Sequence, residues 1–326
     1  MNLLGRSARK FRMWGIGESP ISIQFQGLAF SALAWLSLVA SLWLPQTDVQ
    51  TQLLLLSPII FVLGVPHGAL DIVFARQLAG VRSTAGWCLF TLAYLCAAAS
   101  VVALWWFTPM FFLAAFLLVS ALHFSGDPEG ATPAVFRTLY GGAVIFCPLA
   151  LHRAEVTELF AFLAGLPAAQ ALVHALQWAA WPWIAAICVA AKVGWKQKPA
   201  RTVELLSITA LLTFAPPLIG FTIFFCGMHS ARHVLRTRDY SSAKTLRYLL
   251  RIAVLPMFAT LAGVALVWWF SSGKPLDMRL AQLLFVGLAA LTVPHMIVVE
   301  RVRFTGWVAG RDPPQEPVLN GATHDR

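Results

Sequence analysis

The sequence predicts an all-α fold, a polytopic bundle of about ten transmembrane helices. Of its 326 residues, 59% are hydrophobic and only 12% are charged, which is about half the charged fraction of a soluble domain. The mean hydropathy is +0.72, and apolar runs long enough to cross a bilayer follow one another along the chain. These features exclude an ordinary soluble enzyme, a disordered chain and a nucleic-acid-binding domain.

Ten apolar windows mark the expected spans. They run over residues 25–44, 53–74, 86–107, 109–125, 133–151, 171–191, 203–215, 217–236, 252–270 and 280–300. The seventh and eighth windows are separated only by Pro216 and Pro217, because proline ends one helix and can begin the next. A short interfacial helix is expected within residues 152–170.

Residues 1–304 are expected to form a single membrane domain, integral to the cell (inner, or cytoplasmic) membrane. The first apolar window is about 20 residues long and has no clear small-residue cleavage site, so we interpret it as a retained span and not as a signal peptide. Residues 305–326 are polar and contain Pro313, Pro314 and Pro317. We expect them to form a mobile cytoplasmic tail.

The positive charges predict the orientation of the bundle. If the chain crosses ten times with both termini in the cytoplasm, 21 of its 24 Lys and Arg residues fall inside. The remaining three, Arg153, Lys274 and Arg279, fall outside. Cytoplasmic loops of membrane proteins are enriched in Lys and Arg, so this division favours cytoplasmic termini. The net charge of +10 then reflects orientation in the membrane and not a nucleic-acid partner.

The five cysteines indicate neither a disulfide framework nor a zinc site. Their number is odd, all of them lie inside apolar runs, and none has Cys-x-x-Cys spacing. We therefore interpret them as small buried apolar side chains.

The histidines carry the strongest functional pattern. Five of the eight lie in the late part of even-numbered spans: His67, His123, His229, His233 and His295. Every even span runs from outside to inside in this topology, so all five are expected at a similar depth, in the cytoplasmic half of the membrane. Burying several imidazoles in an apolar bundle is costly unless they share a partner, and a metal ion is the simplest such partner.

Local spacing supports a metal site. A carboxylate follows each of the first two histidines by four residues, as Asp71 and Asp127, and His233 follows His229 by four. Residues at i and i+4 share a helix face about 6 Å apart. Two histidines so placed can bind one metal ion, while a carboxylate can be a second ligand or can accept a hydrogen bond that orients the imidazole. Imidazole without thiolate suits iron, zinc, copper or manganese; an apolar site favours iron, the usual metal for oxygen chemistry on apolar molecules.

Other polar residues receive simpler interpretations. The histidines on the outer side or in the tail are assigned no role: His152, His174 and His324. Arg232 and Arg236, at the inner end of a span, are interpreted as headgroup-binding or positive-inside residues and not as catalytic ones. Glu300 is expected either beside the metal site or paired with Arg301 or Arg303.

The motifs, taken in order, resemble the Brp/Blh family, the bacteriorhodopsin-related-protein-like β-carotene 15,15′-dioxygenases of bacteria and archaea. The resemblance spreads over residues 60–303. Its motifs are Pro66-His67-Gly68-Ala69-Leu70-Asp71, His123-Phe124, His229 to Arg236, and Pro294-His295-Met296 through Glu300. Members are integral membrane, iron-dependent enzymes that cleave β-carotene centrally with O₂ to yield two molecules of retinal.

This resemblance implies an Fe(II) cofactor, an apolar carotenoid and O₂ as substrates, and a surrounding of membrane lipid. It carries the family's metal ligands onto His67, His123, His229 and His233. The additional or outer candidates are His295, Asp71, Asp127 and Glu300. Asp71 and Asp127 would receive imidazole N–H bonds and fix the rings. Hand-over of retinal to an opsin-type protein is a further expectation.

The chain departs from the family pattern at two places. Ile72 stands where a histidine is expected after Asp71, and Ser125 stands where a glycine is expected after Phe124. The histidines survive both changes, so the departures bear on which carotenoid is cleaved.

Two other classes of protein remain open. A membrane di-iron desaturase or hydroxylase would need about eight histidines in several His-rich boxes, whereas five are available here. A non-enzyme, such as a carotenoid or retinal carrier, an opsin-assembly factor or a metal transporter, would yield no product. A transporter would also need ligands along a path and not at one depth.

Overall fold

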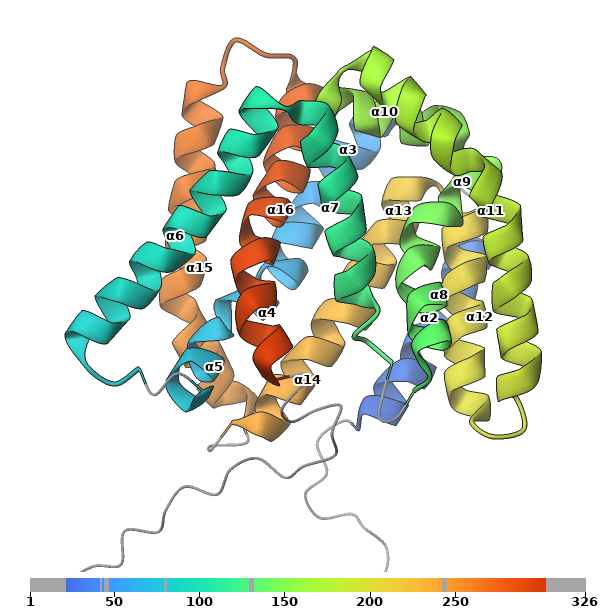
Figure 1. Ribbon diagram of the computed structural model, residues 1–326, viewed down its shortest axis with the longest axis horizontal. Helices are drawn as coiled ribbons and strands as arrows, with labels where there is room; N and C mark the ends of the chain where they lie inside the picture. Colours follow the sequence, from blue (N-terminus) through green and yellow to red (C-terminus); the bar gives the residue numbers. More distant parts are fainter. Residues whose placement is uncertain are drawn as a thin grey trace, which may run out of the picture.

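The computed structural model describes residues 22–41, 43, 47–78, 81–128, 132–241 and 245–302. Every regular element within these residues is a helix (Figure 1), so the predicted all-α bundle is confirmed. Both ends of the chain, including the tail expected at 305–326, lie outside the described residues.

The helices follow one another with short connections. In chain order they are α2 (Ile23–Ser41), α3 (Val49–Ile59), η1 (Ile60–Gly64), α4 (Pro66–Ala69), α5 (Asp71–Leu78), α6 (Thr84–Phe107), α7 (Pro109–Phe124), α8 (Ala134–Phe146), α9 (Pro148–Leu151), α10 (Arg153–Ala164), α11 (Leu166–Gly194), α12 (Pro199–Phe214), α13 (Pro217–Ile223), η2 (Phe224–Ser230), α14 (Ala231–Tyr240), α15 (Leu246–Phe270) and α16 (Leu276–Val302).

Eight helical segments of the described chain are long and apolar enough to cross a membrane, and α7 is a shorter apolar helix of 16 residues. The protein is therefore a polytopic membrane protein. The remaining expected span corresponds to α12, whose apolar run is interrupted by Arg201 and Glu204. The expected interfacial helix is α10, which lies at one end of the bundle (Figure 1). It turns into α11 at Gly165, whose φ of 81° favours glycine.

Proline positions explain where many helices begin. Proline lacks a backbone N–H and has a fixed φ, so it is well tolerated in the first helical turn. Five helices start with a proline: α4, α7, α9, α12 and α13. Three others start at side-chain caps. Asp48 accepts a hydrogen bond from Thr51 N at 2.9 Å, Ser83 accepts one from Gly86 N at 3.1 Å, and Thr245 accepts one from Tyr248 N at 3.4 Å.

Two π-helical segments, η1 and η2, pack against each other in the middle of the bundle. Segments of this kind are rare and often occur at functional sites. Their close approach depends on Gly64, because a Cβ at this position would overlap the Phe225 ring. The first histidine of the predicted site follows η1 by three residues, and His229 lies within η2.

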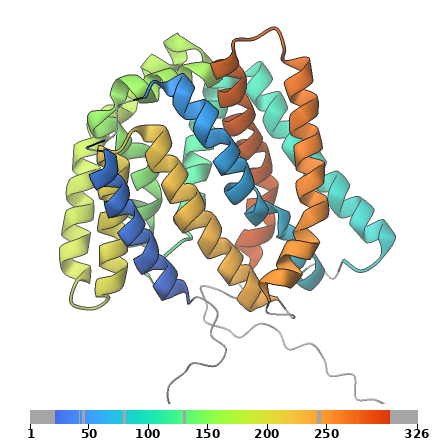
Figure 2. The same cartoon turned by 180° about the vertical axis from the view of Figure 1, so that it is seen from behind.

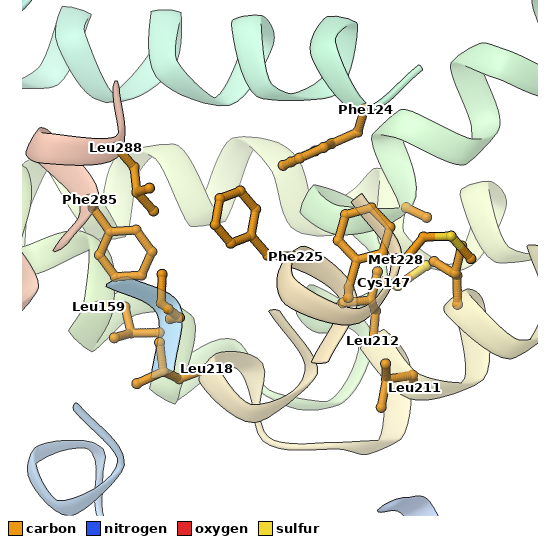
Figure 3. Close-up of a cluster of buried hydrophobic side chains, with 14 of the residues drawn as sticks. Phe124, Cys147, Leu159, Leu211, Leu212, Leu218, Phe225, Met228, Phe285 and Leu288 are labelled. Carbon is orange, nitrogen blue, oxygen red and sulfur yellow. The ribbon is translucent and has the colours of Figure 1, made fainter. Parts of the chain in front are cut away.

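The bundle has a covered centre and two edges, at which the helices α6, α15 and α11 are largely exposed. Helices α6 and α15 lie together at one edge, α11 and α12 lie at the other, and α16 lies between them (Figures 1 and 2). None of the α6 residues is fully buried, whereas the span of α13, η2 and α14 is the most enclosed together with α8 and α9. Figure 3 shows part of the main apolar core, in which Phe124, Phe225 and Met228 adjoin the histidine-bearing segments.

Candidate metal centre

The structure brings the five singled-out histidines together. They come from five elements, since His67 lies on α4, His123 on α7, His229 on η2, His233 on α14 and His295 on α16. Each is at most 7% exposed. The ring centroids are 4.5 Å apart for His123 and His229, 4.9 Å for His233 and His295, and 5.1 Å for His67 and His295. The five side chains therefore form one buried cluster, which we call the histidine cluster.

Three of these side chains already have donor spacing that suits one metal ion. One ring nitrogen from each of His67, His123 and His229 lies within 4.8 Å of the others. Nε2 of His123 lies 2.9 Å from Nε2 of His229. Two nitrogens bound to one ion at about 2.1 Å along perpendicular bonds are about 3 Å apart. The facing pair thus matches neighbouring ligands of a single ion.

Asp127 orients His229 and not His123, the histidine four residues before it. Its Oδ1 and Oδ2 lie 3.0 Å and 3.1 Å from Nδ1 of His229. The expected i, i+4 relation fails because α7 ends at Phe124 and the chain turns through Gly126 before reaching Asp127. A carboxylate only accepts hydrogen bonds, so Nδ1 of His229 carries the proton and Nε2 keeps a lone pair for the cluster.

Asp71 likewise orients a histidine from another helix. Its Oδ1 lies 2.6 Å from Nδ1 of His295, and its Oδ2 accepts a hydrogen bond of 3.0 Å from the Tyr94 hydroxyl. A shared helix face with His67 is lost because α4 ends at Ala69 and α5 begins anew at Asp71. Nε2 of His295 is fully buried and has no hydrogen-bond partner among the described residues. A histidine that binds a metal ion through Nε2 is expected to show such a buried nitrogen without a protein partner, so His295 fits a ligand.

His67 is held by backbone and hydroxyl oxygens that sequence reasoning missed. Its Nδ1 contacts the carbonyl oxygen of Gly64, one turn earlier, and lies 3.1 Å from Oγ of Ser230. Because the carbonyl only accepts, Nδ1 donates and Nε2 is left as the metal-binding nitrogen. Ser230 follows His229 directly, which was the available signal, but its contact depends on how η1 meets η2.

His233 and Glu300 complete the set of predicted site residues. The His233 ring adjoins two other histidines of the cluster, with its centroid 5.6 Å from that of His67 and 4.9 Å from that of His295. The edge of Phe74 packs against it. Glu300 lies near the end of α16 and is half-buried. The side chains of its expected partners Arg301 and Arg303 lie outside the described residues.

The interpretation of Arg232 as a headgroup-binding residue is wrong. Arg232 is 2% exposed and forms a two-pronged ion pair with Glu204, with N–O distances of 2.8 Å and 2.6 Å. The Tyr140 hydroxyl donates to the same carboxylate, and Arg232 Nε donates to Gln26. Glu204 is the one acidic residue in its apolar window, and an acid buried within a span usually has such a partner.

Arg232 and Arg236 together hold the segment that carries Asp127. Arg232 Nη1 donates to the Asp127 carbonyl oxygen at 3.1 Å, and Arg236 Nη2 donates to the same oxygen at 2.7 Å. Arg236 Nη1 also donates to the Gly126 carbonyl oxygen. The two arginines thus fix the backbone next to the carboxylate that orients His229, which is a supporting role in the site.

Aromatic rings surround the cluster. Phe225 stacks on the His229 ring at a centroid distance of 5.7 Å, and Phe124 meets the same ring edge-on at 4.9 Å. Both phenylalanines are buried. The cluster is therefore an apolar, water-poor site whose polar groups are imidazoles, two carboxylates and their partners.

Comparison with known proteins identifies the family. A sequence profile described as β-carotene 15,15′-dioxygenase matches residues 58–302, which include all five histidines. The chain belongs to the β-carotene 15,15′-dioxygenase family. The resemblance seen in the ordered motifs is thereby confirmed, and the protein is placed among carotenoid-cleaving dioxygenases.

Two proteins named as β-carotene 15,15′-dioxygenases, one of them as a probable one, are similar to this chain over most of their length. The β-carotene 15,15′-dioxygenase of the uncultured marine bacterium 66A03 is 31% identical over 255 residues, which cover 75% of this chain and 91% of that protein. The probable β-carotene 15,15′-dioxygenase Blh of Halobacterium salinarum is 26% identical over 283 residues, covering 73% of this chain and 80% of the relative. No solved structure is significantly similar to the chain.

Proposed function

We propose that the histidine cluster holds Fe(II) and that the protein cleaves β-carotene, or a close relative, centrally with O₂ to yield two molecules of retinal. The observation that carries the proposal is the meeting of five buried imidazoles from five elements, in a chain of the β-carotene 15,15′-dioxygenase family. Imidazoles without thiolate suit iron. The bare Nε2 of His295 and the 2.9 Å spacing of His123 and His229 fit a common ion.

The four proposed ligands are His67, His123, His229 and His233. His295 is the next candidate, since its bare Nε2 adjoins the cluster. Asp127 and Asp71 keep Nδ1 of His229 and His295 protonated and fix the two rings, while Gly64 does the same for His67. Glu300 stays a candidate for an outer contact.

Bound Fe(II) would supply the activation of O₂. The protein supplies the surroundings: an apolar site that excludes water, and side chains that hold the polyene so that its central double bond is the one presented. Phe225 and Phe124 cover the histidines and suit a hydrocarbon substrate. Such a substrate is dissolved in lipid, so it would reach the cluster from the membrane.

The cellular setting is part of the proposal. We infer that the protein resides in the cytoplasmic membrane with both termini in the cytoplasm, on the strength of its charge distribution. Retinal is itself apolar, so it would leave into the lipid or pass to an opsin-type protein.

Expression in a β-carotene-producing bacterial host tests this function. Cells with the wild-type protein should lose their orange colour and accumulate retinal. His229→Ala should keep the colour. His174→Ala is the matched control, because this exposed histidine of α11 bonds only Gln177 among its described contacts, and it should behave as wild type. Persistent colour with protein and iron both present would favour the alternative of a carotenoid or retinal carrier.

A further inference from the structure

Tyr94 is a half-buried side chain that contacts Asp71, the carboxylate beside His295 of the histidine cluster. It lies on α6, where none of the residues is fully buried. The neighbouring apolar side chains Leu89, Leu92 and Leu95 are 59–68% exposed, as expected for a face toward lipid. Tyr94 alone is turned so that its hydroxyl donates to Oδ2 of Asp71 at 3.0 Å, with the Leu291 carbonyl oxygen 3.3 Å away.

The two oxygens of Asp71 then have different partners. Oδ2 accepts from the Tyr94 hydroxyl, and Oδ1 accepts from Nδ1 of His295 at 2.6 Å. Asp71 is 3% exposed, so an oxygen without a donor would be left unsatisfied in an apolar interior, at a cost. The tyrosine hydroxyl removes that cost and also selects one orientation of the carboxylate.

That orientation decides what His295 presents to the cluster. With the carboxylate fixed, His295 keeps its proton on Nδ1 and directs the lone pair of its bare Nε2 inward. A carboxylate free to turn would allow the imidazole to rotate or to change tautomer. Contacts of this kind around a metal ligand typically alter metal affinity by about 10- to 100-fold.

We propose that Tyr94 is a positioning residue of the metal site, which acts on His295 through Asp71. The chain of contacts Tyr94–Asp71–His295 joins α6, α5 and α16, so it also links α6 to the site. The inference rests on the proposed metal site. It adds to that site a residue that lies outside the family-like motifs and that touches no proposed ligand directly.

Metal binding by the purified full-length protein in detergent tests this role. Co(II) serves as a spectroscopic probe whose visible absorption reports the ligand geometry, and iron content after dialysis against a chelator reports retention. Tyr94→Phe keeps the ring and removes only the hydroxyl. We expect it to weaken Co(II) binding by about tenfold, the lower end of the range for outer partners, and to change the absorption spectrum. Tyr248→Phe on α15 is the matched control and should change neither.

A double-mutant cycle separates positioning from simple packing. In an Asp71→Ala background the hydroxyl of Tyr94 has nothing to orient, so Tyr94→Phe should cause no further loss of Co(II) affinity. Equal affinity and spectrum for wild type and Tyr94→Phe would overturn the inference and leave the metal site intact. A loss of affinity that is unchanged in the Asp71→Ala background would overturn it too. A wild-type protein that binds neither Co(II) nor iron would overturn the proposed function together with this inference.

Discussion

The Asp71 carboxylate contacts Nδ1 of His295 at 2.6 Å, although 224 positions separate the two residues in the sequence. Asp127 has the same relation to His229, 102 positions away. Each carboxylate follows one histidine of the cluster by four residues and orients another. The carboxylate of one sequence motif therefore orients the imidazole of another, in both cases.

The contact between Asp127 and His229 predicts the effect of removing the Asp127 carboxylate. Asp127→Ala deletes the acceptor that fixes Nδ1 of His229, so we expect iron affinity to fall by about 10- to 100-fold. Competition with a chelator on the purified protein measures this. Asp48→Ala is the control, since it removes an exposed carboxylate whose side chain caps α3 through Thr51 N. Affinity that falls equally in both variants, or in neither, would contradict the assigned contact.

Gly141 predicts a packing effect at His123. A Cβ at Gly141 would collide with the backbone of Ala121 and Ser125, on either side of His123 at the end of α7. Backbone atoms cannot turn aside as a side chain can, so Gly141→Ala should displace α7 and lower both thermal stability and iron content. Gly263→Ala on α15 meets nothing within 4 Å and should be neutral or slightly stabilising. Thermal unfolding in detergent would show the difference, and two indistinguishable variants would refute the argument.

The buried ion pair of Arg232 and Glu204 predicts unequal costs for single and double variants. Glu204→Leu leaves the guanidinium buried without its carboxylate, and breaking a buried pair in this way costs about 3–5 kcal/mol. Replacing both residues, as Glu204→Leu with Arg232→Met, removes the unpaired charge and should restore much of the stability. Thermal unfolding of the three proteins measures this. A double variant less stable than Glu204→Leu would contradict the prediction.

The orientation in the membrane predicts reporter-fusion results. Fusions after residues 48 and 274 should report the outside, and a fusion after residue 196 should report the cytoplasm, because the Lys and Arg residues divide 21 to 3 in this topology. At each site, an alkaline phosphatase fusion and a fluorescent-protein fusion should give opposite signals, so each fusion is the control for the other. A cytoplasmic signal at 48 would overturn both the topology and the common depth inferred for the histidines.

The sequence was sufficient to predict the bundle and to single out the histidines. Helix spans follow from the length and hydropathy of each run, which are local properties. The common depth of His67, His123, His229, His233 and His295 follows from the direction of each span, so it too needed no tertiary structure. The ring distances in the structure agree with five side chains at one level.

Contacts across helices were not accessible from the sequence in the same way. The i, i+4 rule pairs Asp71 with His67, but it holds only inside an unbroken helix, and α4 ends before Asp71. Arg232 lies near the end of an apolar run, where arginine usually meets headgroups, and only the packing of α12 reveals Glu204 beside it. Tyr94 has no polar neighbour in the sequence that signals a role, because its partner Asp71 lies on another helix.

Retinal production by the purified protein tests the central claim most directly. Wild type and His229→Ala, each in detergent with Fe(II), receive β-carotene and O₂, and chromatography follows both the substrate and the products. The wild-type protein should form two molecules of retinal for each β-carotene consumed, and His229→Ala should form almost none. Iron-loaded wild-type protein that leaves β-carotene intact, or equal retinal formation by His229→Ala, would contradict the account.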